Sequence, residues 1–425
     1  MTPVVRWTGR QTLALRQARR MSIRAFAEHL GVAVGSVTNW EHRGDAIRLR
    51  GETQEILDRD LALAPPDVRQ RFDADMAQAA PPPAAAVPVD PTWTRPDTGS
   101  GEHAEPRTAS LADQRLRLRF ALANPEHVDQ VTAAYLREQV TALDLRYDRI
   151  PSATLLGEAG HWYGQITFLR DHASTVDVRR DLNLAVAESA ILMGKLVWDA
   201  SMRRDHRTAL AYFDQAEHAA IAGNDTVSVT RAHLRRCYVA LYGQKNPTAG
   251  LAIATRAAAT SRPVSNVLTG MSLLYAAEAH AMLRRQRQCE QTLSAAESHF
   301  AKVTDSDPAA ALFSPPDLPR VAGSCYLFLD DTTRAVRLLR DTLAILPGQS
   351  KAAAIAAANL ALAQVRRRRV SDAVDSLHKA IDIVEATWGG GGLAVTFTVA
   401  RALGPWRAVP AVGDVHDRLH TLLAA

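Results

Sequence analysis

The chain is poor in cysteine and has no apolar run long enough to cross a membrane. Its three cysteines, at positions 237, 289 and 325, are too few and too widely spaced for a disulfide framework or a paired metal-binding motif. Asn359 and Gln364 interrupt the apolar stretch at 351–365, which falls short of the roughly 20 residues that a membrane helix needs. The first residues lack the apolar core of a signal peptide. We therefore expect a cytoplasmic protein that does not enter a membrane.

Motifs for catalysis and for cofactor binding are absent as well. The sequence contains no phosphate-binding or dinucleotide-binding glycine motif, no zinc-peptidase motif and no nucleophile elbow. The glycine run at 388–393 has no lysine and follows an expected helix rather than a strand, so it predicts a flexible end to the helical region. We predict that the chain is not an enzyme and binds neither a cofactor nor a metal ion.

Signals for β-strands are nearly missing from the long C-terminal part, where glycine and proline separate windows with helical periodicity. Seven of the 21 prolines fall between Pro81 and Pro106, a composition typical of a linker. We predict an all-α protein in three parts. These are a small N-terminal unit at 1–76, a Pro- and Ala-rich linker at 77–109, and a large helical unit at 110–425.

Basic charge is concentrated at the N-terminus. Residues 1–50 hold nine arginines and three carboxylates, a net charge of +6, so the rest of the chain carries −1 of the total of +5. A local basic excess of this kind favours a small nucleic-acid-binding unit, although a solvated arginine-rich terminus has the same composition.

A helix-turn-helix pattern occupies this basic segment. A first helix is expected to end near Arg20, and Ser22 is a good N-cap for a second helix at 23–30. Gly31 suits a left-handed turn, and a third helix is expected at about 34–41. The predicted core consists of Phe26, Leu30, Val37 and Trp40.

This segment resembles the Xre (Cro/C1-type) helix-turn-helix family. The matching positions are Leu15-Arg16, Ser22, Ala27, Gly31-Val32, Val37, Trp40-Glu41 and Gly44. The resemblance implies an ion pair between Arg16 and Glu41 that stabilises the fold. Two residues depart from the family pattern: Arg20 stands where glycine is frequent, and Gly35 lies inside the third helix.

The resemblance also implies that the third helix enters the major groove of double-stranded DNA. Asn39 is suited to a bidentate contact with adenine, Ser36 and Thr38 to phosphates or base edges, and Val34 to a thymine methyl. The arginines beside this face are expected to bind phosphates. The predicted DNA-binding residues are Arg20, Arg24, Val34, Gly35, Ser36, Thr38, Asn39 and Arg43. The alternative is a retained fold that now binds protein.

A small–large–small apolar triplet recurs in the C-terminal unit after a polar turn, at spacings of 40, 40, 46 and 38 residues. The five instances are Ala209-Phe213-Ala216, Ala249-Ile253-Arg256, Cys289-Leu293-Ala296, Ala335-Leu339-Thr342 and Ala373-Leu377-Ala380. The pattern resembles the second helix of the tetratricopeptide repeat over about 177–388, and it implies an α-solenoid.

In such a solenoid the first helix of each repeat lines a concave groove. The register of the triplets places six polar or aromatic residues in that groove: Trp198, Arg231, Tyr238, Glu278, Arg320 and Asn359. The other groove positions are small or aliphatic. We expect a mostly apolar channel for an extended peptide or an amphipathic small molecule. The alternative is that Arg231, Glu278 and Arg320 pair across repeats.

A helix-turn-helix unit joined to a tetratricopeptide-like body resembles the peptide-pheromone-responsive regulators of Gram-positive bacteria and multi-domain regulators of actinobacteria. The resemblance implies a homodimeric transcriptional regulator whose body senses a peptide or small molecule. The alternative is a DNA-tethered scaffold that docks another regulatory protein. The apolar tail, Leu393–Ala425, either caps its own neighbouring helix or pairs with a second subunit.

Overall fold

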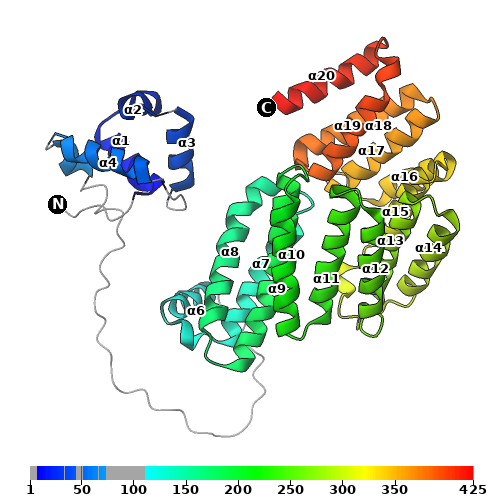
Figure 1. Cartoon of the computed structure of the whole chain (residues 1–425), viewed down its shortest axis with the longest axis horizontal. Coiled ribbons are helices and arrows are strands. Elements are labelled where there is room, and N and C mark those ends of the chain that lie inside the picture. The colour runs from blue at the N-terminus through cyan, green and yellow to red at the C-terminus, as the bar shows by residue number, and fades with distance from the viewer. Residues whose placement is uncertain are drawn as a thin grey trace, which may run out of the picture. The chain divides into compact units, whose positions relative to one another are not determined.

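The computed structural model describes residues 7–32, 34–44, 49, 51–65, 67–72 and 111–424. These ranges are helical with connecting turns and contain no strand. They fall into two compact units, a head within residues 1–103 and a body within residues 104–425 (Figure 1). The predicted linker at 77–109 lies outside the described residues.

The head is built from short helices. They are α1 (Gly9–Ala18), α2 (Ile23–Leu30), α3 (Val34–Arg43), α4 (Gly51–Leu63) and a helical segment at 67–72. Ser22 caps α2, because its hydroxyl accepts a hydrogen bond from the Ala25 amide at 3.2 Å. Gly31 ends α2 in the left-handed conformation, with φ 68°. The helix bounds and the turn therefore agree with the sequence pattern to within two residues.

The core of the head contains the predicted apolar residues and further residues that were not predicted, among them Trp7. Phe26, Leu30 and Val37 are buried, and Trp40 is half-buried against them. Trp7 is also fully buried, and its indole N–H donates to Asp58 at 2.6 Å. Because Trp7 precedes the first helix, helical periodicity gave no indication of its place in the core.

Arg16 and Glu41 form the predicted ion pair. The guanidinium binds both carboxylate oxygens, Nε to Oε1 at 2.6 Å and Nη2 to Oε2 at 2.8 Å, and Nη1 donates to the Met21 carbonyl at 2.9 Å. The hydrogen bonds that Arg16 donates to Glu41 raise the pKa of Arg16. One side chain thus joins α1, the α1–α2 turn and the end of α3.

The body consists of antiparallel helix pairs packed side by side (Figure 1). Consecutive odd-numbered helices from α7 onward contact one another, and even-numbered helices pack between them in an outer layer. The helices are α6 (Leu111–Ala123), α7 (Gln130–Arg146), α8 (Ser152–His172), α9 (Val176–Ala200), α10 (His206–Ala222), α11 (Thr226–Tyr238), α12 (Pro247–Ser261), α13 (Asn266–Met282), α14 (Gln286–Phe300), α15 (Asp317–Phe328), α16 (Thr332–Ile345), α17 (Lys351–Arg366), α18 (Val370–Thr387), α19 (Gly390–Ala402) and α20 (Pro410–Ala424).

The recurring triplets form the buried stripe of the even-numbered helices. Phe213 of α10 packs directly against Gly194 of α9. A β-carbon at position 194 would lie 2.3 Å from the Phe213 ring, so the glycine allows the two helices to approach closely. In α12 the predicted triplet is wrong by one residue. The buried positions there are Gly250, Ala254 and Ala257, and Arg256 is exposed. A π-helical turn at Val239–Gly243 precedes α12 and accommodates the extra residue.

From α9 to α18, every turn from an inner to an outer helix contains a residue other than glycine in the left-handed conformation. These residues have φ angles between 55° and 64°: Arg203, Lys245, Arg284, Asp330 and Arg368. The α9–α10 turn contains a second such residue, Met202, with φ 52°. The left-handed turns recur with nearly the same period as the triplets. The repeat is therefore present in the backbone as well as in the buried side chains.

Helices from the two halves of the body meet at Asp199, near the end of α9. Its carboxylate binds the Lys351 ammonium of α17 at 2.9 Å, the Ser152 hydroxyl of α8 at 2.8 Å and the Gly390 amide of α19 at 2.9 Å. Asp199 and Lys351 are buried. Together with the contact between α9 and α19, these bonds close the odd-numbered helices from α9 to α19 into a ring.

The glycine run is part of this closure, so the prediction of a flexible end is wrong. Gly390–Gly392 form the first turn of α19 and are buried. A β-carbon on Gly390 would lie 2.6 Å from the Asp199 carbonyl oxygen, which has no room to move because it belongs to the backbone. The glycines let α19 approach the end of α9.

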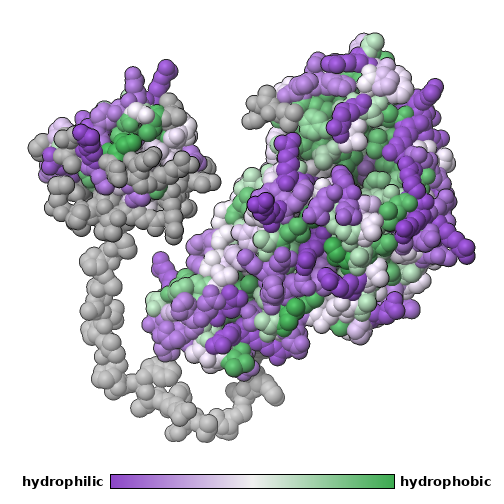
Figure 2. Space-filling model, viewed as in Figure 1, coloured by the Kyte–Doolittle hydropathy of each residue, from purple (hydrophilic) through white to green (hydrophobic). Residues whose placement is uncertain are grey.

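The apolar tail packs on its own chain. Leu403, Val412, Val415, Leu419 and Leu422 are buried in one cluster with residues of α17 and α18. Hydrophilic side chains cover most of the visible face of the body, with apolar residues in scattered patches (Figure 2). Among the described helices, none combines the length and the hydrophobicity of a membrane span.

Removing the ammonium at the closure should destabilise the body. Lys351→Ala leaves the Asp199 carboxylate buried without its ion-pair partner, and we expect the free energy of unfolding to fall by about 3–5 kcal/mol. Urea unfolding followed by circular dichroism measures the change. The control is Lys379→Ala at an exposed position on α18, which should change stability by less than about 0.5 kcal/mol. Equal effects of the two variants would contradict the role given to the closure.

The left-handed turns predict a stabilising substitution. Arg368→Gly removes the unfavourable contact of a β-carbon at φ 57°, and we expect a gain of about 1 kcal/mol in the free energy of unfolding. The neighbouring Arg367 is equally exposed but right-handed, with φ −87°, so Arg367→Gly should instead cost about 0.5–1 kcal/mol. Denaturant unfolding of both variants should give changes of opposite sign.

Candidate functional site

The head presents one polar face around α3. Gly35, Thr38 and Asn39 are exposed there, whereas Ser36 is half-buried and Val37 points into the core. Arg24 on α2 and Arg20 in the α1–α2 turn are also exposed. The side chains of Val34 and Arg43 lie outside the described part of the chain. Of the eight predicted DNA-binding residues, the structure therefore places five on the exposed surface of the head.

Arg20 adopts the left-handed conformation, with φ 55°. A side chain with a β-carbon adopts this conformation only at a steric cost that glycine does not have. Arg20 therefore introduces local strain into the α1–α2 turn.

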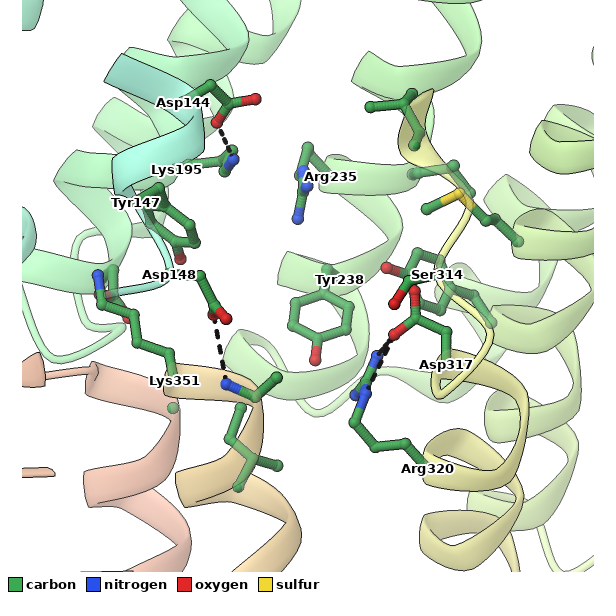
Figure 3. Close-up of a pocket in the computed structure, with 18 of the residues that line it drawn as sticks. Asp144, Tyr147, Asp148, Lys195, Arg235, Tyr238, Ser314, Asp317, Arg320 and Lys351 are labelled. Carbon is green, nitrogen blue, oxygen red and sulfur yellow. Dashed lines mark hydrogen bonds and ion pairs between the residues drawn. The ribbon is translucent and has the colours of Figure 1, made fainter. Parts of the chain in front are cut away.

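The body contains a cavity of about 380 Å³ that is partly open to solvent and is lined mainly by the inner helices (Figure 3). Its walls come from α7 and the turn that follows it, α9, α11, α13, α15 and α17, and from the segment before α15. Ten of the lining residues are carboxylates, lysines or arginines: Asp144, Asp148, Lys195, Asp199, Arg203, Arg231, Arg235, Asp317, Arg320 and Lys351. A smaller cavity of about 170 Å³ shares Arg203, Tyr238 and Arg320 with it and adds Glu278 and Asn359.

Several of these charges pair inside the ring. Asp144 binds Lys195 and lies 3.6 Å from Nη2 of Arg231, and Asp317 binds Nη2 of Arg320 at 2.8 Å. Burial lowers the pKa of Lys195 to about 8, although Asp144 opposes that shift. Burial raises the pKa of Asp148, whose carboxylate accepts from the Ala352 amide at 3.3 Å.

Tyr147 lies between two ammonium groups on the cavity wall. Its ring centre is 4.2 Å from Nζ of Lys195 and 4.1 Å from Nζ of Lys351. Across the cavity, Tyr238 packs against Tyr275 with ring centres 5.3 Å apart. The aromatic rings thus separate and shield the cations rather than forming an apolar channel.

Glu278 is the buried acid of the smaller cavity. The Tyr242 hydroxyl donates to Oε1, but Oε2 has no hydrogen-bond partner among the described residues. Burial raises the pKa of Glu278 to about 7, and the Tyr242 hydrogen bond and the charges of Arg320 and Arg203 only partly oppose that shift.

Five of the six predicted groove residues line the two cavities. Arg231, Tyr238 and Arg320 line the larger one, and Tyr238, Glu278, Arg320 and Asn359 line the smaller one. Trp198 is buried behind the wall instead, where its indole N–H lies 3.1 Å from Nδ1 of His206. Arg231, Glu278 and Arg320 do not pair with one another; their partners are Asp144, Tyr242 and Asp317.

The predicted mostly apolar channel is wrong, because the charged residues on α7, α9 and the start of α17 were not included. On α9 the cavity-facing positions are Lys195 and Asp199, whereas the predicted Trp198 is buried. Lys195 and Asp199 lie four residues apart in an otherwise apolar stretch, and Lys351 begins a run of alanines. Such isolated charges in apolar helices were the available signal for a polar cavity.

Comparison with known proteins adds no assignment to this geometry. No protein-family model matches the chain, and no curated protein matches it.

The Glu278 carboxyl predicts a pH-dependent stability. Because its pKa is about 7 in the folded chain and lower in the unfolded chain, ionisation destabilises the fold as the pH rises from about 4.5 to 7. Glu278→Gln keeps an acceptor for Tyr242 and removes the charge. We expect its stability advantage over the parent chain to be small at pH 5 and to reach roughly 3 kcal/mol at pH 8.

Urea unfolding at both pH values measures this advantage. The control Glu297→Gln changes an exposed carboxyl on α14 and should show no such rise with pH. A constant difference between Glu278→Gln and the parent chain from pH 5 to pH 8 would contradict the assignment.

Proposed function

We propose that this chain is a sequence-specific DNA-binding transcriptional regulator of the cytoplasm, whose body senses a ligand and mediates dimerisation. The observation that carries the DNA-binding part is the arrangement of α2, Gly31 and α3. It exposes Asn39 and Thr38 on the side opposite Val37, and the Arg16–Glu41 pair tethers it at both ends. This arrangement supports the Xre helix-turn-helix assignment, in which such a helix reads the major groove.

The sensing part of the proposal depends on the ring of helix pairs. Stacked pairs with small residues at their crossings, as at Gly194 and Phe213, support a tetratricopeptide-like solenoid. The cavity supports a ligand-binding role, because its volume is in the range of small-molecule sites and polar groups from several helices converge on it. A homodimer would place two heads on a roughly palindromic operator.

A protein-docking scaffold is the second candidate. Leu116 and Phe120 on α6 are 67% and 58% exposed, and Val131 on α7 is 47% exposed. Apolar side chains of this size on the surface favour a partner protein. In that case the head would localise a complex on DNA without responding to a ligand in the cavity.

The DNA-binding assignment is tested at Asn39. A preferred operator is first selected from random-sequence DNA with the full chain. Asn39→Ala removes a base-reading amide, and we expect it to weaken operator binding by about 1–3 kcal/mol, or roughly 5- to 150-fold, with little effect on random DNA. Arg24→Ala should weaken binding to both DNAs alike. It should also reduce the slope of log K against log salt concentration by about 1, the contribution of one phosphate contact.

Gln17→Ala is the matched control, since Gln17 is an exposed side chain on α1 that is not among the predicted DNA-binding residues. It should leave both affinities unchanged. Selection that yields no preferred sequence would overturn the proposed function, and an equal loss on operator and random DNA for Asn39→Ala would remove that residue as a base reader.

A further inference from the structure

Two arginines on the wall of the larger cavity, Arg203 and Arg235, form no ion pair within the described residues. The six cations of the cavity face four carboxylates, and Asp144, Asp199 and Asp317 pair with Lys195 and Arg231, with Lys351 and with Arg320. The side chains of Arg203 and Arg235 form no ion pair or hydrogen bond with any described residue, and Nε of Arg203 is buried without a partner. The lining therefore carries an excess of two positive charges.

The guanidinium groups of Arg203 and Arg235 lie on the wall of the same cavity, and both affect Tyr147. Both lower the pKa of Tyr147 against the larger effect of burial, so both lie within electrostatic range of that phenol. The Arg203 guanidinium also lies over the ring of Tyr238, 5.4 Å from its centre. Figure 3 shows Arg235 extending into the cavity between Lys195 and Tyr238.

Hydroxyl donors surround this space. The hydroxyls of Tyr147, Tyr238 and Tyr275 line the cavity without a hydrogen-bond partner among the described residues. Unpaired donors of this kind, beside two unpaired guanidinium groups, match a ligand rich in acceptor oxygens.

We propose that the larger cavity binds a small organic dianion, with its two negative charges held by Arg203 and Arg235 and an oxygen accepting from the Tyr147 hydroxyl. This assignment rests on the ligand-sensing part of the proposed function and specifies the ligand's chemistry. Phosphate monoesters and dicarboxylates share that chemistry. The cavity volume of about 380 Å³ lies near the lower end of the roughly 300–1,000 Å³ typical of small-molecule sites.

An extended peptide fits these observations less well. The amide of Asn359, the group best suited to a peptide backbone, already donates to the Ser324 hydroxyl at 3.1 Å, and Arg320 is engaged by Asp317. The closure at Asp199 also joins the two ends of the helix array, where an open groove would continue.

The test uses the full-length protein and two probes, glycerol 3-phosphate and succinate, titrated calorimetrically at pH 8 and constant ionic strength. Acetate is the monoanionic comparison. We expect saturable binding of at least one dianion, with acetate binding at least tenfold weaker. The double variant Arg203→Gln/Arg235→Gln should bind that dianion at least tenfold more weakly than the parent chain.

Arg204→Gln/Arg207→Gln is the matched control, because it removes the same charge from exposed positions beside Arg203. It should change the affinity less than twofold, and circular dichroism establishes that both double variants are folded. Tighter binding of glycerol 3-phosphate indicates that the site prefers phosphate monoesters, and tighter binding of succinate indicates that it prefers dicarboxylates.

Absence of saturable binding by both probes, or equal losses in the two double variants, would overturn the dianion site. Because the titration contains no DNA, this result is independent of the head. Dianion binding that leaves operator affinity unchanged would instead keep the site and remove the sensing part of the proposed function.

Discussion

The body depends on one buried carboxylate. Asp199 binds a lysine, a serine and a backbone amide from three helices, and each of these groups is far from it in the sequence. Burying the charges of Asp199 and Lys351 costs free energy, because both groups lose their hydration. The ion pair offsets this cost only when the other hydrogen-bonding positions of the carboxylate are also satisfied, and both oxygens of Asp199 have partners here. The inner helices then surround a cavity instead of forming an open groove.

The charged interior follows from this closure. In an open array the groove faces solvent, and charges in it are screened; inside a ring the same charges sit in a medium of lower dielectric and interact more strongly. The chain accommodates them by pairing most of them and by placing the Tyr147 ring between two of the paired cations, Lys195 and Lys351. Two guanidinium groups are left over, and they give the cavity its chemical character.

Local patterns allowed much of the head and the helix pairs to be predicted. Ser22, Gly31 and the apolar residues of α2 and α3 determine their own helix ends and buried faces, and the Arg16–Glu41 pair could be placed by resemblance. On α11, α13 and α15 the repeat register also placed cavity residues correctly. On α9 the register pointed to Trp198 instead of Lys195 and Asp199 as the cavity residues. On α12 it was wrong by one residue, which the π-helical turn before that helix accommodates. The closure could not be predicted at all, because no periodicity relates Asp199 to Lys351.

The ring also determines how the body loses its structure. In a linear array of repeats the terminal units have one neighbour each, so they fray first and unfolding proceeds inward. Here α19 contacts α9, and the units at both ends support each other. The helices from α9 to α19 therefore have no free end from which unfolding can start, so opening any one contact between them breaks the ring. Its folding is consequently more cooperative than that of an open array with the same number of repeats.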